Sequence, residues 1–364
     1  MLGDAIQCLI ERRDLPQEVM EQAMHALMAG QAGEAEAAAF LTALRMKGET
    51  AAELAAGARV LRQHMEPLQI GDRQAVDTCG TGGDHSGTLN LSTAAAFVVA
   101  GCGIPVVKHG NRAVSSRSGS ADVLTALGVR VDVAPEAARL CLEEAGMAFC
   151  FAPRYHPAMK HVAKVRQALG FRTLFNLLGP LCNPARVRYQ LLGVGRPELL
   201  DLMAETLGRL GGTEAFVVHG SDGLDEVSLS GPTQVRWVRK EGIEKRTWTP
   251  MDFGLPSHSV ESIRVRDAAE SAVRIKAVLQ GEHGPARDFV VANAAAVLVL
   301  VGVADDLRSA AARAAQAIDA GQAQAVLRGL IRVTNTDPAA GQVRPGNREG
   351  SHESKAHPRD GHGN

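Results

Sequence analysis

The segment DTCGTGGDHSGTLNLST, residues 77–93, leaves a predicted strand at 75–79, crosses a glycine-rich turn and enters a predicted helix. Glycine permits positive φ and lets the backbone approach a ligand closely. The amide groups of such a turn, with those at the start of the helix, favour an anion. The glycines alone also fit a tight turn closed by a Ser or Thr cap. Further donors at Asn90, Ser92 and Thr93 favour a phosphate site, although the spacing matches neither a Rossmann nor a P-loop motif.

Short apolar runs and helical patterns alternate strictly around and beyond this segment. The strands are predicted at 75–79, 104–108, 129–133, 148–152, 190–194 and 215–219. The helices between them are predicted at 92–101, 120–127, 135–145, 157–169 and 197–210, with three more at 267–280, 286–302 and 306–320. This order predicts right-handed βαβ units and an α/β domain with a mostly parallel central sheet.

The residues before the glycine-rich segment show helical patterns only. Apolar residues recur at helical spacing over 16–30 and 34–46. A third helix begins at Thr50, because Thr50 and Glu53 have the spacing of a capping box. These patterns predict a small all-helical domain ahead of the larger α/β domain.

The composition limits the class of protein. Of 364 residues, 45% are apolar and 22% charged, which excludes a mainly disordered chain, and the net charge of -1 provides no field that attracts nucleic acid or an anionic membrane. No CxxC pair indicates a zinc ribbon or redox site. The N-terminus lacks a signal-peptide pattern, and the apolar run at 290–304 predicts a buried helix, so we expect a cytoplasmic protein. Residues 335–364 predict a disordered polar tail.

A second polar loop, KHGNRAVSSRSGSAD at 108–122, follows the next predicted strand. Both loops therefore emerge at the carboxyl edge of the sheet, where α/β folds bind ligands. Lys108 and Arg112 can neutralise phosphate charge, and further hydrogen bonds can come from Asn111, Ser115, Ser116 and Ser120. A polar loop that caps the next helix is the alternative, but so many polar residues exceed what capping requires.

Two further groups carry possible chemistry. Asp225 and Glu226, in the sequence GLDEVS, follow another predicted strand and predict a magnesium site, although an isolated pair of this kind is most often an ordinary acidic turn. Arg166 lies on a predicted helix and can bind a substrate carboxylate or, equally, make structural bonds. No Ser-His-Asp or Cys-His set is apparent, so we expect catalysis by positioning and charge neutralisation, with Lys108 and Asp84 in support.

Taken together, several motifs resemble one family. They are GTGGD at 80–84, NLST at 90–93, KHGNRAVSS at 108–116, SGSADVL at 118–124, HPAMKHV at 156–162, FRTLFNLLGPLCNPA at 171–185, GLDE at 223–226 and VANAAA at 291–296. In this order they resemble the anthranilate phosphoribosyltransferases of tryptophan biosynthesis, which belong to the nucleoside phosphorylase/phosphoribosyltransferase-like superfamily. The resemblance covers roughly residues 1–333.

The resemblance implies a domain organisation, an assembly and a reaction. A helical domain at 1–70, completed by about 165–185, adjoins an α/β domain at 71–164 and 186–334 that binds the donor and metal, and the family members are usually homodimers. Anthranilate and phosphoribosyl pyrophosphate would give N-(5-phosphoribosyl)anthranilate and pyrophosphate, with Mg2+ as cofactor, two ions per subunit. Nucleic acid and membrane are not expected partners.

The resemblance also implies roles for individual residues. The donor would contact Gly80, Gly83, Asp84, Thr88, Asn90, Leu91, Ser92, Thr93, Lys108, His109, Gly110, Asn111, Arg112, Ala113, Val114, Ser115, Ser116 and Ser120. Anthranilate would contact Gly80, His109, Asn111, His156, Arg166 and Pro180. The metal ions would be held by Ser92, Asp225 and Glu226.

Two other functions fit parts of the pattern. A pyrimidine nucleoside phosphorylase shares this architecture, but the acidic pair and the HGNR loop favour the transferase, because pyrophosphate needs the metal. A non-catalytic relative that binds nucleic acid would show a basic stripe, which the near-zero net charge disfavours.

Overall fold

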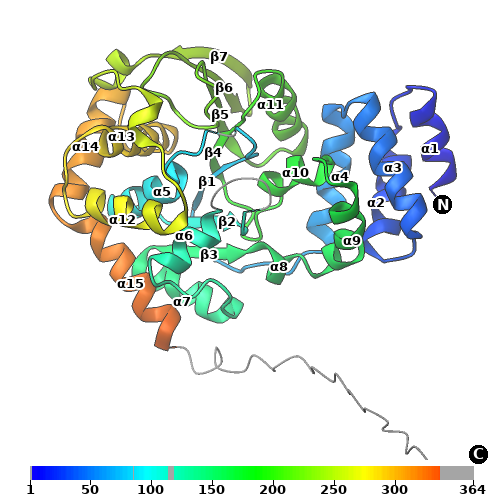
Figure 1. Ribbon diagram of the computed structural model, residues 1–364, viewed down its shortest axis with the longest axis horizontal. Helices are drawn as coiled ribbons and strands as arrows, with labels where there is room; N and C mark the ends of the chain where they lie inside the picture. The colour runs from blue at the N-terminus through cyan, green and yellow to red at the C-terminus, as the bar shows by residue number, and fades with distance from the viewer. Residues whose placement is uncertain (1, 85, 114–118, 337–364) are drawn as a thin grey trace, which may run out of the picture.

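The computed structural model describes residues 2–84, 86–113 and 119–336 (Figure 1). The predictions for Val114, Ser115 and Ser116, and for the tail from residue 337 onward, lie outside these residues. The prediction that the tail begins at Asn335 is wrong, because Asn335 and Thr336 belong to the last helix and Asn335 donates to the carbonyls of Gly128 and Ile331. The strands are β1 (Val76–Gly80), β2 (Val106–Gly110), β3 (Met147–Phe151), β4 (Tyr189–Gly193), β5 (Glu214–Gly220), β6 (Thr233–Arg239) and β7 (Gly242–Trp248). In the described part of the chain they form one seven-stranded sheet in the order β3-β2-β1-β4-β5-β6-β7. The pairs from β3 to β5 are parallel, and β6 and β7 are antiparallel additions at one edge.

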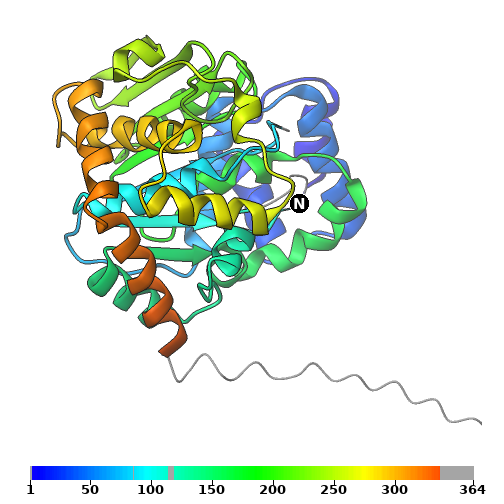
Figure 2. The same ribbon diagram turned by 60° about the vertical axis from the view of Figure 1, so that its left-hand side comes forward.

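The helices divide between the two domains. The helical domain contains α1 (Gly3–Ile10), α2 (Gln17–Met28), α3 (Glu34–Lys47), α4 (Ala51–Gln63), α9 (Lys160–Leu169) and α10 (Leu174–Leu178). The helices around the sheet are α5 (Leu91–Gly101), α6 (Ser120–Ala126), α7 (Pro135–Ala145), α8 (Ala152–Tyr155), α11 (Leu199–Leu210), α12 (Ala268–Leu279), α13 (Pro285–Leu300), α14 (Leu307–Asp319) and α15 (Gln322–Thr336). Figures 1 and 2 place α12 to α15 together on one side of the sheet.

The alternation of side chains along each strand builds two cores. Leu191 and Phe216 point to the face covered by α5 and α13, whereas Leu192 and Val217 point to the face that meets α11 and the helical domain. Successive residues of a strand face opposite sides, so a strand with apolar residues at consecutive positions is buried on both faces. This burial explains why the central strands appear in the sequence as continuous apolar runs.

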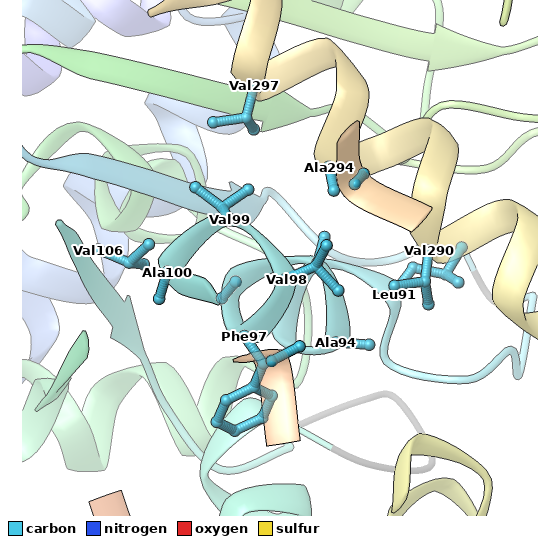
Figure 3. Packing of buried hydrophobic residues seen from close by; sticks show 14 of the residues in the cluster. Leu91, Ala94, Phe97, Val98, Val99, Ala100, Val106, Val290, Ala294 and Val297 are labelled. Atoms are coloured by element: carbon cyan, nitrogen blue, oxygen red, sulfur yellow. The ribbon is translucent and has the colours of Figure 1, made fainter. Parts of the chain in front are cut away.

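Helices α5 and α13 pack closely because small side chains line their contact. Figure 3 shows Val98 and Val99 of α5 near Ala294 and Val297 of α13. All four residues are fully buried. Burial of this kind contributes about 25 cal/mol for each Å² of apolar surface removed from water. The contact holds the start of α5, and with it the end of the glycine-rich turn, against the body of the domain.

Most predicted elements are confirmed, but one predicted strand is wrong and several elements were not predicted, the short helices α8 and α10 among them. The stretch 129–133 is not a strand: Val129, Val131 and Val133 are buried, yet the position beside β2 belongs to β3. Its alternation therefore reflects packing against helices rather than pairing in the sheet. The sequence reasoning also missed α1, α15 and the β6–β7 hairpin, whose polar outer residues weaken the apolar pattern. Within the described ranges, no helix is long and apolar enough to cross a membrane.

Candidate functional site

The glycine-rich turn lies at the point where the strand order reverses. β1 has β2 on one side and β4 on the other, so the turns after β1 and β4 diverge at the carboxyl edge of the sheet. A crevice forms at such a position in an open α/β sheet. In this protein a cavity of about 620 Å³ lies in that crevice, and residues of both domains line it. The expectation that the two polar loops share one edge is confirmed.

Most of the predicted site residues line this single cavity. They are Gly80, Gly83, Asp84, Thr88, Asn90, Ser92, Lys108, His109, Gly110, Asn111, Arg112, Ala113, Ser120, His156, Arg166, Pro180, Asp225 and Glu226. The side chains of Leu91 and Thr93 do not line it: both are fully buried, and Leu91 belongs to the hydrophobic core beneath. Thr93 instead donates its amide to the Asn90 side chain, which caps α5. Neighbouring side chains in the first turn of α5 therefore point in different directions, some to the cavity and some to the core. The NLST motif alone does not show which side chain points where.

The two acidic residues bind backbone amides that we expected to bind phosphate. Asp225 Oδ2 accepts a hydrogen bond from the amide of Gly82 at 2.9 Å, and Glu226 Oε1 accepts one from the amide of Ser92 at 3.0 Å. Gly193 permits this close approach, because a Cβ at that position would overlap the carbonyl group of Asp225. The turn after β5 is thus pressed against the turns after β1 and β4.

Negative charge at this edge is only partly balanced. Burial, and the mutual repulsion of Asp225, Glu226 and Asp84, raise the pKa of the Asp225 and Glu226 carboxyls. Lys108 opposes part of this effect at Glu226. Within the described residues, no group of three or more His, Cys, Asp or Glu side chains is arranged to hold a metal ion by itself. A carboxylate pair short of ligands fits Mg2+, which commonly completes its shell with water and substrate phosphate.

Lys108 lies at the floor of the cavity, where its ammonium group is bonded to other residues rather than free. Its ammonium donates to the carbonyl of Thr78 and, at 3.1 Å, to Ser92 Oγ. Burial lowers the pKa of Lys108, while the nearby Asp77 carboxylate acts in the opposite direction. Asp77 is held in turn by the side chain of Asn183 at 2.8 Å. The structure therefore links Lys108 to the start of α5 as well as to the negative edge of the cavity.

His109 and His156 form a buried pair at the inner wall. Their Nε2 atoms lie 3.1 Å apart, and His109 Nδ1 lies 3.1 Å from the carbonyl oxygen of Gly179. A carbonyl only accepts, so Nδ1 of His109 carries the proton and its Nε2 accepts from His156. Burial lowers the pKa of His109 to about 3 and that of His156 to about 4. Both rings are therefore neutral near pH 7 and present an uncharged wall.

Arg166 reaches the cavity from α9. Its guanidinium lies 5.3 Å from the ring centre of Phe175, and burial lowers its pKa. Among the residues that the structure describes, no carboxylate or carbonyl lies within bonding distance of this guanidinium. A purely structural role for Arg166 would require a bonding partner, and none is found among the described residues. A carboxylate on a ligand would supply that partner.

Sequence reasoning assigned no role to Arg172. The residue lines the cavity and donates to the carbonyl of Thr81. Its guanidinium lies directly over Gly83, which has φ +83° and where a Cβ would approach it to 2.6 Å. Arg172 thereby connects the helical domain with the glycine-rich turn. The only signal in the sequence was its place within the conspicuous FRTLFNLLGP segment.

Comparisons with known proteins agree with this geometry. Residues 3–65 match the helical bundle domain of a glycosyl transferase family, and residues 72–324 match the α/β domain of the same family. The anthranilate phosphoribosyltransferase of Thermomicrobium roseum is 52% identical over 327 residues, covering 89% of this chain and 94% of the relative. That of Moorella thermoacetica is 50% identical over 331 residues, covering 91% and 98%.

Solved structures give the same result. Anthranilate phosphoribosyltransferase from Thermus thermophilus superposes with a TM-score of 0.85 at 43% identity, covering 91% of this chain and 99% of that one. The enzyme from Saccharomyces cerevisiae in complex with PRPP and Mg gives a TM-score of 0.85 at 29% identity, covering 92% and 98%. The two-domain fold is thus shared with these proteins, and the chain belongs to the anthranilate phosphoribosyltransferase family.

Proposed function

We propose that the cavity transfers the phosphoribosyl group of phosphoribosyl pyrophosphate to the amine of anthranilate, giving N-(5-phosphoribosyl)anthranilate and pyrophosphate in L-tryptophan biosynthesis. One observation carries the proposal beyond family membership. The same cavity is lined by two carboxyl groups whose pKa is raised, Asp225 and Glu226, and by the Arg166 guanidinium, which has no carboxylate or carbonyl partner among the described residues. The carboxylates suit a metal-bound pyrophosphate, and the guanidinium suits the carboxylate of an aromatic acid. A nucleoside phosphorylase would require neither feature.

The donor occupies the part of the cavity beside the glycine-rich turn. The yeast relative contains PRPP and Mg, and here Ser92, Asp225 and Glu226 would hold two magnesium ions. When bound, the metal neutralises charge on the departing pyrophosphate. Asp225 and Glu226 now accept hydrogen bonds from the amides of Gly82 and Ser92, and these amides would be able to donate to phosphate oxygens if the carboxylates held the metal instead.

The acceptor binds at the helical-domain end of the cavity. Arg166 would contact the carboxylate of anthranilate, and Asn111 its amine. His109, His156 and Pro180 form the wall along which the ring enters. Because both imidazoles are neutral, this wall adds no charge that would compete with Arg166 for the carboxylate. The yeast relative has been solved with 4-fluoroanthranilate.

The chemistry follows from positioning. The anthranilate amine is a neutral nucleophile, so the reaction needs no strong general base as pyrophosphate leaves and the anomeric carbon gains cationic character. Lys108, fixed by Thr78 and Ser92, adds positive charge beneath the leaving group.

The assembly and location remain part of the proposal. Family resemblance supports a homodimer formed through the helical domain and a cytoplasmic location. Sedimentation of the purified protein would give twice the mass of one chain, and a single-chain mass would reject the dimer.

The test uses the fluorescence of anthranilate. Purified protein with phosphoribosyl pyrophosphate and MgCl2 should consume anthranilate and release one pyrophosphate for each molecule lost, and EDTA should stop the reaction. Absence of both turnover and donor binding by calorimetry would reject the assignment of the cavity.

Variants separate the two ends of the cavity. Asp225→Asn with Glu226→Gln should abolish the magnesium-dependent part of donor binding, measured by calorimetry independently of turnover. Arg166→Met should raise the KM for anthranilate about tenfold or more, because a charge-assisted pair contributes about 1.5–3 kcal/mol, while donor binding stays unchanged. A rise in the Kd of the donor with Arg166→Met would contradict the division of roles.

A further inference from the structure

A second cavity, of about 220 Å³, lies at the junction of the two domains. Arg62 at the end of α4 lines one side, the segment that includes Arg186 lines another, and the turn from α11 to β5 lines a third. Arg59 Nη2 donates to the carbonyl of Arg209 at 3.4 Å close by, which ties α4 to α11. Pro180 lines this cavity and the substrate cavity, so one segment separates the two.

The cavity contains positive charge without a counter-ion. No acidic residue is among the described residues that line it, and neither Arg62 nor Arg186 has a carboxylate within ion-pair distance in the described part of the chain. Burial lowers the pKa of the Arg62 guanidinium, and the charge of Arg186 adds to this effect. Arg62 is partly buried and Arg186 is exposed, and an anion between them would offset the repulsion of the two like charges.

Other buried cations of the chain show the contrast. Lys47 is paired with Glu53 at 2.9 Å, and Arg287 with Asp319 at 2.7 Å. The guanidiniums of Arg166 and Arg172 lack a carboxylate partner among the described residues, and both line the substrate cavity. These two partly buried arginines without an acidic partner thus line a cavity. Arg62 follows the same pattern at the second cavity.

Backbone donors complete the site. α11 ends at Leu210, and Gly211 and Gly212 follow with φ values of +67° and +77°. The amides of Gly212 and Thr213 donate to no residue that the structure describes. Consecutive amides in such a turn form a concave site for an anion.

We propose that this cavity binds a small multivalent oxyanion, of orthophosphate or pyrophosphate chemistry, between the two guanidiniums and the amides of the α11–β5 turn. The volume suits such a group, because one water molecule occupies about 30 Å³ in the liquid. None of the described residues that line the cavity is aromatic, so they offer no ring on which a base or an indole could stack. A bound oxyanion would join the helical domain to the α/β domain at a site separate from the substrate cavity.

Arg186 offers the cleaner variant. Arg62 Nε donates to the carbonyl of Leu181 at 2.8 Å, so its replacement also disturbs the wall shared with the substrate cavity. Arg186 is exposed and has no side-chain hydrogen bond to a described residue. Arg186 has a φ of +48°, and the strain of this backbone conformation is about the same for Gln as for Arg. The substitution Arg186→Gln therefore leaves the backbone strain nearly constant. Arg188, exposed and not part of the cavity lining, is the matched control.

The experiment is calorimetric titration of the full chain with sodium phosphate and, separately, sodium pyrophosphate, at an ionic strength held constant with chloride. Arg186→Gln should weaken one binding site about tenfold or more. Arg188→Gln should keep every Kd within about twofold, and turnover of anthranilate by both variants should remain near the wild-type value. A crystal soaked in phosphate should show the anion beside Arg62.

Two outcomes would overturn the proposal. One is unchanged stoichiometry and affinity in Arg186→Gln for both anions, and the other is equal weakening in Arg186→Gln and Arg188→Gln, which would indicate diffuse surface charge. Given a site that responds to Arg186, tighter binding of pyrophosphate identifies pyrophosphate as the occupant, and tighter binding of phosphate identifies orthophosphate. Neither result depends on the role proposed for the substrate cavity.

Discussion

Replacing Asn293 by Leu tests whether the Asp225–Glu226 turn is held from behind by a buried amide. Asn293 is fully buried within α13, in the middle of an otherwise apolar run. Its Oδ1 accepts from the amide of Val227 at 2.9 Å, and its Nδ2 donates to the carbonyls of Val227 and Phe289 at 3.0 and 2.9 Å. Leu has a similar volume but makes none of these bonds, so both backbone groups of Val227 lose this partner.

The magnitude follows from those two groups. A buried backbone donor or acceptor left unsatisfied costs about 1–3 kcal/mol. Burial of the apolar Leu side chain offsets part of the cost of two such groups. The expected loss in the free energy of unfolding is therefore about 2–5 kcal/mol. Urea unfolding followed by the fluorescence of Trp237 and Trp248 measures this quantity, because both tryptophans lie in strands of the α/β domain, which also contains Asn293. Magnesium-dependent donor binding should weaken as well, since Val227 adjoins Glu226.

Asn335 supplies a matched control. Its Nδ2 also donates to two carbonyls, of Gly128 and Ile331 at 3.0 and 2.8 Å, but the side chain is exposed. Water can replace these bonds, so Asn335→Leu should cost less than about 1 kcal/mol. If Asn293→Leu lowers stability by less than about 1 kcal/mol, or by no more than Asn335→Leu, the buried amide does not hold the turn and the reasoning is wrong.

Two further predictions concern the turn and the histidine pair. Gly193→Ala should displace Asp225 and weaken magnesium-dependent donor binding. Gly208→Ala is the control: the site is exposed on a helix with open space around it, so the change should raise the free energy of unfolding by about 0.5–1 kcal/mol. Equal donor binding in both variants would contradict the packing argument. His109 and His156 have folded pKa values of about 3 and 4, below the unfolded value near 6.5. The unfolded chain therefore binds protons first as the pH falls, and stability present above pH 6.5 should decrease by about 2 kcal/mol between pH 7 and 5.5. Urea unfolding at the two pH values measures this loss, and its persistence in a His109→Gln/His156→Gln variant would assign it elsewhere.

Local patterns in the sequence were sufficient for much of the fold. The alternation of apolar runs and helices identified β1, β2 and β3 to within one or two residues, and the run around Asn293 identified a buried helix. These elements are buried on most sides, so their hydrophobic pattern is strong. The stretch 129–133 has the same pattern for a different reason, because burial under helices and pairing in a sheet select the same residues.

Edge elements and helix registers required the tertiary structure. The hairpin at β6 and β7 carries charged residues on its outer face, as an exposed sheet edge requires, and so it gave little apolar signal. The motif NLST predicted a ligand-binding helix start, but only the packing of α5 shows that Leu91 and Thr93 turn into the protein while Ser92 lines the cavity.

The sequence by itself determined which residues were able to bind phosphate, metal and carboxylate, because glycine turns, acidic pairs and arginines have chemistry that does not depend on the fold. Only the tertiary structure decided which of them share a cavity and which atoms are already bonded. It placed Lys108 against Thr78 and Ser92, left Arg166 without a described partner and brought Arg172 over Gly83. Such contacts join residues far apart in the chain, and their distances are set by the packing of whole helices and strands, which no local pattern records.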